Sequence, residues 1–191
     1  YRRPKDGVVF AIVSRKAGPK EGYLWQYRLQ PGANGKMDAV KVREFGLNTG
    51  DEIEALAVDD AAGLVYAAEE KTGIRVYTAD PDAPEGNKEL DFFGREGFTA
   101  DREGIALVDK YVVCTDQKVS SSEYRLYNRS GSRKTARAIF RCGADETDGI
   151  EIESRSLGPK FPKGIMVVMN SKDKNFFILD LAPMLAAVPT K

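Results

Sequence analysis

A unit of about 45 to 50 residues repeats along the chain, and this period constrains the fold more than any other feature. Three segments open alike, each with a carboxylate cluster that leads directly into an apolar stretch: DEIEALAV (51–58), DREGIALV (101–108) and DETDGIEI (145–152). Aligned on Glu54, Glu103 and Asp148, the segments are 49 and 45 residues apart. Each is followed by a second apolar stretch that ends in polar residues, and then by a third that carries aromatic residues.

The chain is expected to be all-β. Its apolar runs are rich in Val, Ile, Tyr and Phe and are separated by clusters of Gly, Pro, Asp and Asn, a pattern typical of strands and turns. The expected strands are 8–13, 23–29, 55–58, 64–68, 74–77, 104–108, 111–115, 124–127, 136–140, 150–152, 164–169 and 176–179. Only residues 181–188 favour a helix, which Pro183 and Pro189 keep short.

This period, with about four strands per unit, predicts a β-propeller. The chain would hold about three and a half four-stranded blades, within 1–48, 49–98, 99–145 and 146–191. The opening segment matches only the later part of a unit and lacks an innermost strand of its own. Because propellers close with roughly four to eight blades, we expect an incomplete ring. Either upstream sequence has been removed, or another chain completes the circle, with self-association as one possibility.

The composition excludes several classes of function. Lys plus Arg and Asp plus Glu both total 29, so the formal net charge is zero, which argues against a general nucleic-acid or anionic-membrane binder. The chain has no His, which excludes Ser-His-Asp and Cys-His nucleophile systems and His-ligated zinc. It begins at Tyr1 and shows no signal peptide and no apolar stretch of ~18 residues. No membrane partner is therefore expected.

The two cysteines, Cys114 and Cys142, are too few for a disulfide scaffold. Their spacing fits no C-x-x-C redox or zinc motif. They can pair with each other or be buried as free thiols, and the apolar run before Cys114 favours burial.

Carboxylates are expected to converge at one edge of each blade. The first and second strands of a blade are antiparallel, so the start of the first and the end of the second lie at the same edge. The residues placed there are Glu54 and Glu70; Asp101, Glu103 and Gln117; and Asp148 and Asn170. Blade symmetry would bring all of them round one channel mouth.

Carboxylates gathered this closely repel one another, so they need compensating positive charge to stay ionised. Ligands made only of oxygen suit hard cations, and Ca²⁺ tolerates irregular sites with six to eight of them. The pattern therefore predicts a calcium cluster that attracts phosphate. Any single carboxylate here could instead be solvated surface, and DEIEAL could be a helix start, but recurrence in register favours the cluster.

Arg15 and Lys16 end a strand that is equivalent to those ending at Glu70 and Gln117. They are expected at the same edge, with positive charge suited to a substrate phosphate. A solvated strand end is the alternative for both.

The ordered set of motifs resembles the β-propeller phytases, the calcium-dependent class that hydrolyses inositol hexakisphosphate (phytate). The matching segments are VSRKAGPKEGYLWQYRL (13–29), IEALAVDDAAGLVYAAEE (53–70), FTADREGIALV (98–108), TDQ (115–117), SSSEYRLYNR (120–129), ETDGIEI (146–152) and LGPKFPKGIMVVM (157–169). They cover most of the chain in the right order.

The resemblance implies a six-bladed propeller with its active site at the wide end of the channel, and a secreted or periplasmic protein. It assigns the catalytic calcium ions to Glu54, Glu70, Asp101, Glu103 and Gln117. It makes Asp148 a further calcium ligand, Asp145 a weaker candidate and Lys16 a phosphate contact, and calcium-bound water would attack phosphorus. The family also takes ligands from an N-terminal half that is not present here, so turnover by this chain alone stays open.

Two other functions are alternatives to phytate hydrolysis. One is a non-catalytic propeller that uses calcium for rigidity and binds a partner with its face. The other is a propeller hydrolase acting on lactones or phosphotriesters, which is disfavoured because those sites usually need a His or a different acid pattern.

Overall fold

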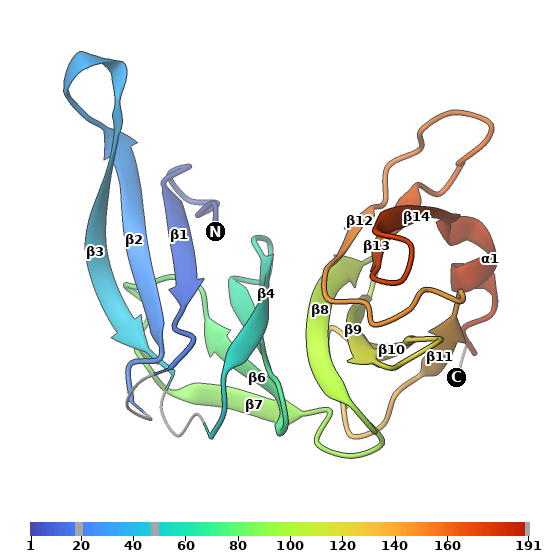
Figure 1. Ribbon diagram of the computed structural model, residues 1–191. Helices are drawn as coiled ribbons and strands as arrows, with labels where there is room; N and C mark the ends of the chain where they lie inside the picture. Colours follow the sequence, from blue (N-terminus) through green and yellow to red (C-terminus); the bar gives the residue numbers. More distant parts are fainter. Residues whose placement is uncertain (18–20, 47–49, 190–191) are drawn as a thin grey trace. The chain divides into compact units, whose positions relative to one another are not determined.

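The computed structural model describes residues 1–17, 21–46 and 50–189, and its strands form four antiparallel sheets (Figure 1). Residues 18–20 of the predicted motif 13–29, and residues 47–49 and 190–191 of the predicted blade segments, lie outside the described part. The chain divides into two compact units, Tyr1–Phe92 and Phe93–Lys191.

The first unit contains two sheets whose strands follow one another in chain order. One sheet consists of β1 (Val9–Ser14), β2 (Leu24–Pro31) and β3 (Met37–Phe45), with the short 3₁₀ turn η1 (Ala33–Gly35) before β3. The other consists of β4 (Ile53–Asp59), β5 (Leu64–Glu69), β6 (Gly73–Thr78) and β7 (Glu89–Phe93). Tyr23, Leu24, Phe45, Ile53 and Tyr77 form a shared core, so these sheets pack on each other.

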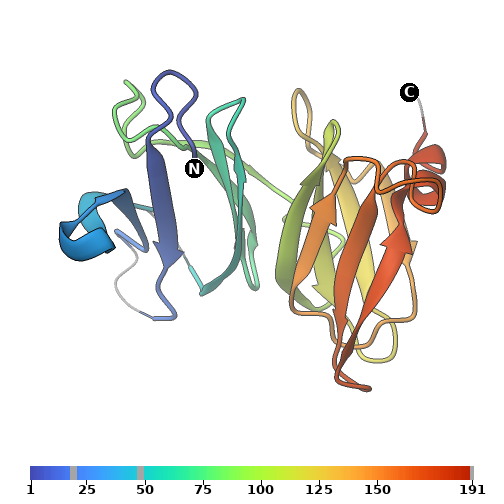
Figure 2. The ribbon, with the colours of Figure 1, turned by 90° about the horizontal axis from the view of Figure 1, so that it is seen from above.

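The second unit repeats this plan. One sheet consists of β8 (Asp101–Val108), β9 (Tyr111–Gln117), β10 (Glu123–Asn128) and β11 (Ala138–Arg141). The other consists of β12 (Ile150–Glu153), β13 (Ile165–Asn170) and β14 (Asn175–Asp180). Figure 2 shows these two sheets side by side, with β8 and β12 in contact. Their core includes Val113, Leu126, Met166 and Val168.

The expected fold class is confirmed: the chain is all-β and forms part of a β-propeller. Each sheet is a meander, in which strands that are consecutive along the chain are hydrogen-bonded neighbours. The middle strands β5, β6, β9 and β10 are almost fully buried, including the charged residues Arg75, Glu123 and Arg125. The β8–β9 hairpin turns through Asp109, whose φ of 48° suits a tight two-residue turn.

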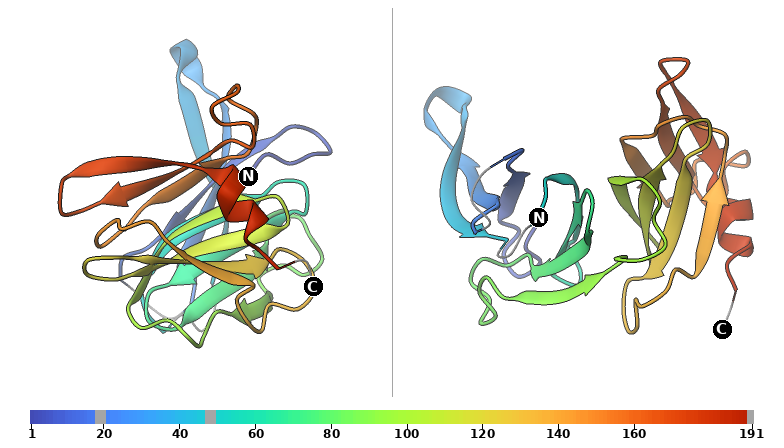
Figure 3. Two further views of the ribbon diagram at one scale, coloured as in Figure 1. Left: turned by 90° about the vertical axis from the view of Figure 1, so that its right-hand side faces the viewer. Right: turned by 60° about the horizontal axis from the view of Figure 1, so that its bottom comes forward.

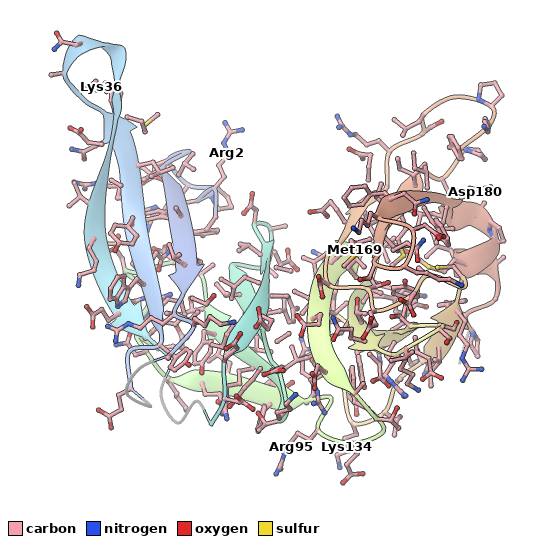
Figure 4. The ribbon with its side chains drawn as sticks, viewed as in Figure 1. Arg2, Lys36, Arg95, Lys134, Met169 and Asp180 are labelled. Atoms are coloured by element: carbon pink, nitrogen blue, oxygen red, sulfur yellow. The ribbon has the colours of Figure 1, made fainter. Side chains whose placement is uncertain are left out.

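The predicted short helix is present as α1 (Leu181–Ala186), which follows β14 near the C-terminal end (Figure 3). Asp180, labelled in Figure 4 where β14 meets α1, caps it by accepting a 3.0 Å hydrogen bond from the Ala182 amide. Pro183 lies in the first turn, where its missing N–H costs no helical hydrogen bond.

Two strands were not predicted from the sequence. In β3 charged residues alternate with Ala and Val, and most of its side chains are exposed, so it lacks an apolar run. In β7 the charged residues Glu89 and Asp91 alternate with Leu90 and Phe92, so no continuous apolar run marks the strand. Because β3 is present, the opening sheet has three strands rather than the expected two.

Both cysteines are free thiols. Cys114 is fully buried, as expected, and burial raises the pKa of its thiol to about 12, which makes it unreactive at neutral pH. Among the described residues, no helix is both long and apolar enough to cross a membrane.

Candidate functional site: acidic edges of the sheets

In the first unit, Glu54 lies at a β-bulge. Ile53 pairs with Glu69 and Ala55 pairs with Ala68, so Glu54 is the extra residue on β4. A bulge turns a side chain away from the regular strand alternation, and Glu54 is exposed. The Glu70 amide donates a 2.9 Å hydrogen bond to the Glu52 carbonyl oxygen. The structure therefore places Glu54 and Glu70 at the same edge of this sheet, as the register predicts.

Lys16 lies beside this edge. Its Nζ donates a 2.7 Å hydrogen bond to Glu52 Oε1 and is 3.9 Å from Glu54 Oε1. Its side chain is 84 % exposed, so these ion pairs contribute little to stability. Glu52 was not predicted as a site residue, although it belongs to the same acidic cluster (51–54).

Arg15 has a different environment from Lys16. Its guanidinium lies 4.4 Å from the centroid of the Trp25 ring, a cation–π contact within the opening sheet. Its proposed contact with substrate stays a prediction.

In the second unit, Asp101, Glu103 and Gln117 come together at the edge of the β8–β9 pair. Asp101 is the direct partner of Gln117 across the two strands. Glu103 lies at a second bulge, between Arg102 and Ile105. A carboxylate oxygen of Asp101 lies within 4.8 Å of one of Glu103, and both residues are half-buried. Two partly desolvated carboxylates at this separation favour a bound dication.

Asp148 reaches the same edge from the segment that leads into β12. Its Oδ1 accepts a hydrogen bond from the Gln117 amide group. This approach depends on Gly104, because a Cβ there would lie 2.7 Å from the Asp148 carbonyl oxygen. Asp101, Glu103, Gln117 and Asp148 therefore lie at one edge of the second unit.

Asp145, the weaker ligand candidate, already accepts a hydrogen bond from the chain itself. Its Oδ1 accepts a hydrogen bond from the Ser120 amide in the β9–β10 turn. Asn170, which the register places at the same edge, is 2 % exposed, and its amide group is hydrogen-bonded within the second unit. Its side chain is therefore not presented to solvent as a ligand.

Sequence reasoning missed the buried charges behind these edges. Glu69 is fully buried and its Oε2 is 2.6 Å from Arg75 Nε. Asp116 is also fully buried, with Oδ2 3.1 Å from Arg125 Nη2. Each directly precedes a predicted ligand, Glu70 or Gln117, and successive strand residues point to opposite faces. Both pairs of polar residues are visible in the sequence, in AAEE (67–70) and CTDQ (114–117). The sequence does not distinguish the buried residue of each pair from the one at the edge.

Glu123 makes the second unit sensitive to acid. Its carboxylate contacts Lys118 Nζ at 2.9 Å and Arg125 Nη2 at 2.7 Å, and the hydrogen bond from Lys118, strengthened by Arg141, lowers its pKa. A lowered pKa in the folded state stabilises the fold above the ordinary pKa of about 4.3, and this contribution is lost as pH falls through the folded-state value. We expect Glu123→Gln to lower the melting temperature at pH 7, with the difference from wild type shrinking below about pH 4. Thermal unfolding between pH 3 and 7 measures this, and a constant difference would contradict it.

Consecutive antiparallel sheets of three or four strands with acidic side chains at their edges define a β-propeller protein with candidate cation-binding sites. The family model described as Phytase matches residues 1–176. The chain belongs to the phytase family, which confirms the resemblance seen in the sequence. It is similar to the 3-phytase of Bacillus subtilis (strain 168), with 31% identity over 185 residues that cover 91% of this chain and 46% of the relative. The chain thus spans about half the length of this curated relative.

Solved structures agree on the fold. The chain is similar to the RRP9 WD40 repeats, with a TM-score of 0.50 and 10% identity, covering 93% of this chain and 49% of that one. It is also similar to a chain of a humanized mutant of the Chaetomium thermophilum Polycomb Repressive Complex 2, with a TM-score of 0.51 and 14% identity, covering 88% and 36%. At these identities the likeness concerns the fold alone.

Proposed function

We propose that the protein is a calcium-dependent phosphomonoester hydrolase that releases phosphate from phytate. Its membership of the phytase family supports the reaction and the substrate class. The observation that carries the proposal is the edge of β8 and β9, where the carboxylates of Asp101 and Glu103 approach within 4.8 Å beside Gln117.

The residues present fit calcium. The edge of the second unit offers oxygens from Asp101, Glu103, Gln117 and Asp148. The sequence contains no His, the side chain that would favour a softer metal. The edge of the first unit offers Glu54 and Glu70. Bound calcium would clamp phosphate oxygens and lower the pKa of a bound water, which supplies the attacking hydroxide.

The side chains have distinct tasks in this proposal. Asp101 and Glu103 hold negative charge close together and are partly shielded from water, which favours a dication over monovalent ions. Gln117 donates its amide hydrogen to Asp148, so its side-chain oxygen is left to face a cation. Lys16, exposed beside Glu52, is the cation suited to a substrate phosphate that metal does not hold.

Phosphate release from phytate, measured with calcium and with an excess of a chelator, tests the proposal. We expect release in calcium and a loss of at least about 100-fold after chelation, restored by adding calcium back. Undiminished activity in chelator would rule out the calcium mechanism. Calcium binding without hydrolysis of any phosphomonoester would favour a non-catalytic binding module instead.

A further inference from the structure

Three buried polar side chains occupy equivalent places in three sheets. Glu69 ends β5, Asp116 is the next-to-last residue of β9, and Asn170 ends β13. Their exposed fractions are 0 %, 0 % and 2 %. Each directly precedes another polar residue at the end of the second strand of its repeat: Glu70, Gln117 and Ser171.

All three side chains accept hydrogen bonds from the loop that enters the first strand of their own repeat. Glu69 Oε1 accepts from the amides of Gly50 and Asp51, the latter at 2.7 Å. This loop continues directly into the acidic cluster that holds Glu54. The carboxylate therefore fixes the backbone just before the β4 bulge.

The second and third repeats show the same contact. Asp116 Oδ1 accepts from the Ala100 amide at 2.8 Å, and both its oxygens lie 3.2 Å from the Thr99 amide. Ala100 immediately precedes Asp101. Asn170 Oδ1 accepts from the Asp145 amide at 3.0 Å, three residues before Asp148.

We infer that Glu69, Asp116 and Asn170 are positioning residues, whose buried oxygens hold the three ligand-bearing loops in place through backbone amides. The inference rests on the proposed calcium site. Burial makes these hydrogen bonds strong, because an amide that loses its acceptor away from water is costly. Groups behind a metal ligand commonly tune affinity by about 10–100-fold.

Glu69 and Asp116 also carry a negative charge, which pairs with an arginine rather than with the loop. Arg75 contacts both Glu69 and Glu89, and Arg125 contacts both Asp116 and Glu123. In the third repeat Asn170 has no charge, and its Nδ2 donates to Asn175 Oδ1 and Asp173 Oδ2. An amide oxygen therefore suffices to hold the loop. Asp116→Asn keeps the Oδ1 acceptor for the Ala100 amide, although its Nδ2 would face the donors of Arg125, so it should retain most of the function that Asp116→Ala loses.

Amide hydrogen exchange in the calcium-free chain tests the loop contact without relying on the proposed function. We expect Asp116→Ala to speed exchange at Thr99 and Ala100 by about tenfold or more, and Asp116→Asn to stay within about threefold of wild type. Asn170→Ala, which leaves no unpaired buried charge and so should fold, is expected to speed exchange at Asp145 by a similar factor. Unchanged exchange in both alanine variants overturns the inference.

Glu123→Gln is the matched control. It removes the carboxylate of a residue that is 3 % exposed and is bound to the same Arg125. That carboxylate contacts Lys118, Arg125 and Arg141, whereas the loop amide of Ala100 donates to Asp116. We expect exchange at Thr99 and Ala100 to be unchanged in this variant. Faster exchange there would show that any loss of buried charge loosens the loop, and would overturn the specific role of Asp116.

Calcium titration, with terbium luminescence as a second probe, then tests the link to the site. We expect Asp116→Ala to weaken affinity by about 10–100-fold, and Asp116→Asn to restore most of it. Equal affinity in wild type and Asp116→Ala overturns the positioning role. If wild type itself binds neither ion, the proposed function fails, and the exchange data still decide whether the loop is held.

Discussion

Glu103→Gln is expected to reduce phosphate release from phytate by at least about 100-fold and to weaken stabilisation by calcium. The substitution keeps the size of the side chain at the β8 bulge but removes the negative charge that faces Asp101. An ion that binds only the folded chain adds about 2.7 kcal/mol to the free energy of unfolding at one hundred times its Kd, and weaker binding lowers that gain. Calcium-dependent thermal shift and a phosphate-release assay measure the two effects.

Glu96→Gln serves as the control, because Glu96 is exposed in the turn before β8 and outside the acidic edge. It should match wild type in both measurements. If calcium raised the melting temperature of Glu103→Gln as much as that of wild type, the assignment of Glu103 as a ligand would be wrong, even if activity fell.

Gly104→Ala is expected to lower the free energy of unfolding by about 3 kcal/mol. A Cβ at Gly104 would lie 2.7 Å from the Asp148 carbonyl oxygen and 2.8 Å from both the amide nitrogen and Cγ1 of Ile150. Two of these atoms belong to the backbone and cannot rotate away, so the segment entering β12 must move from β8. Denaturant unfolding measures the loss. Calcium affinity should fall as well, because Asp148 would be displaced from Gln117.

Gly149→Ala is the matched control, in the same segment and one residue before β12. A Cβ there meets no atom within 4 Å, so the expected change is within about 0.5 kcal/mol. If both alanine variants were equally stable, the close approach of β8 to β12 would not be the reason for glycine at position 104.

The sequence contained enough to predict most strands and the acidic edges. Strand alternation and antiparallel pairing are local rules, so a repeat aligned on Glu54 and Glu103 predicts which strand ends meet. The structure bears this out for Asp101 and Gln117, which are direct partners. Strand β3 was missed because an exposed strand needs no apolar run, and its charged residues resemble a loop.

The sequence by itself therefore determined the architecture of the sheets and the placement of acids at their edges. The two-residue alternation indicates the strands, and the repeat of about 45 to 50 residues indicates which strand ends are equivalent. Only the tertiary structure decided which acids are buried. Glu69 and Glu70 are identical residues in succession, yet Glu69 meets Arg75 and the amides of the entering loop, whereas Glu70 pairs with the exposed Lys71. Those partners come from other strands and turns, and the cost of burying a charge depends on whether they are present.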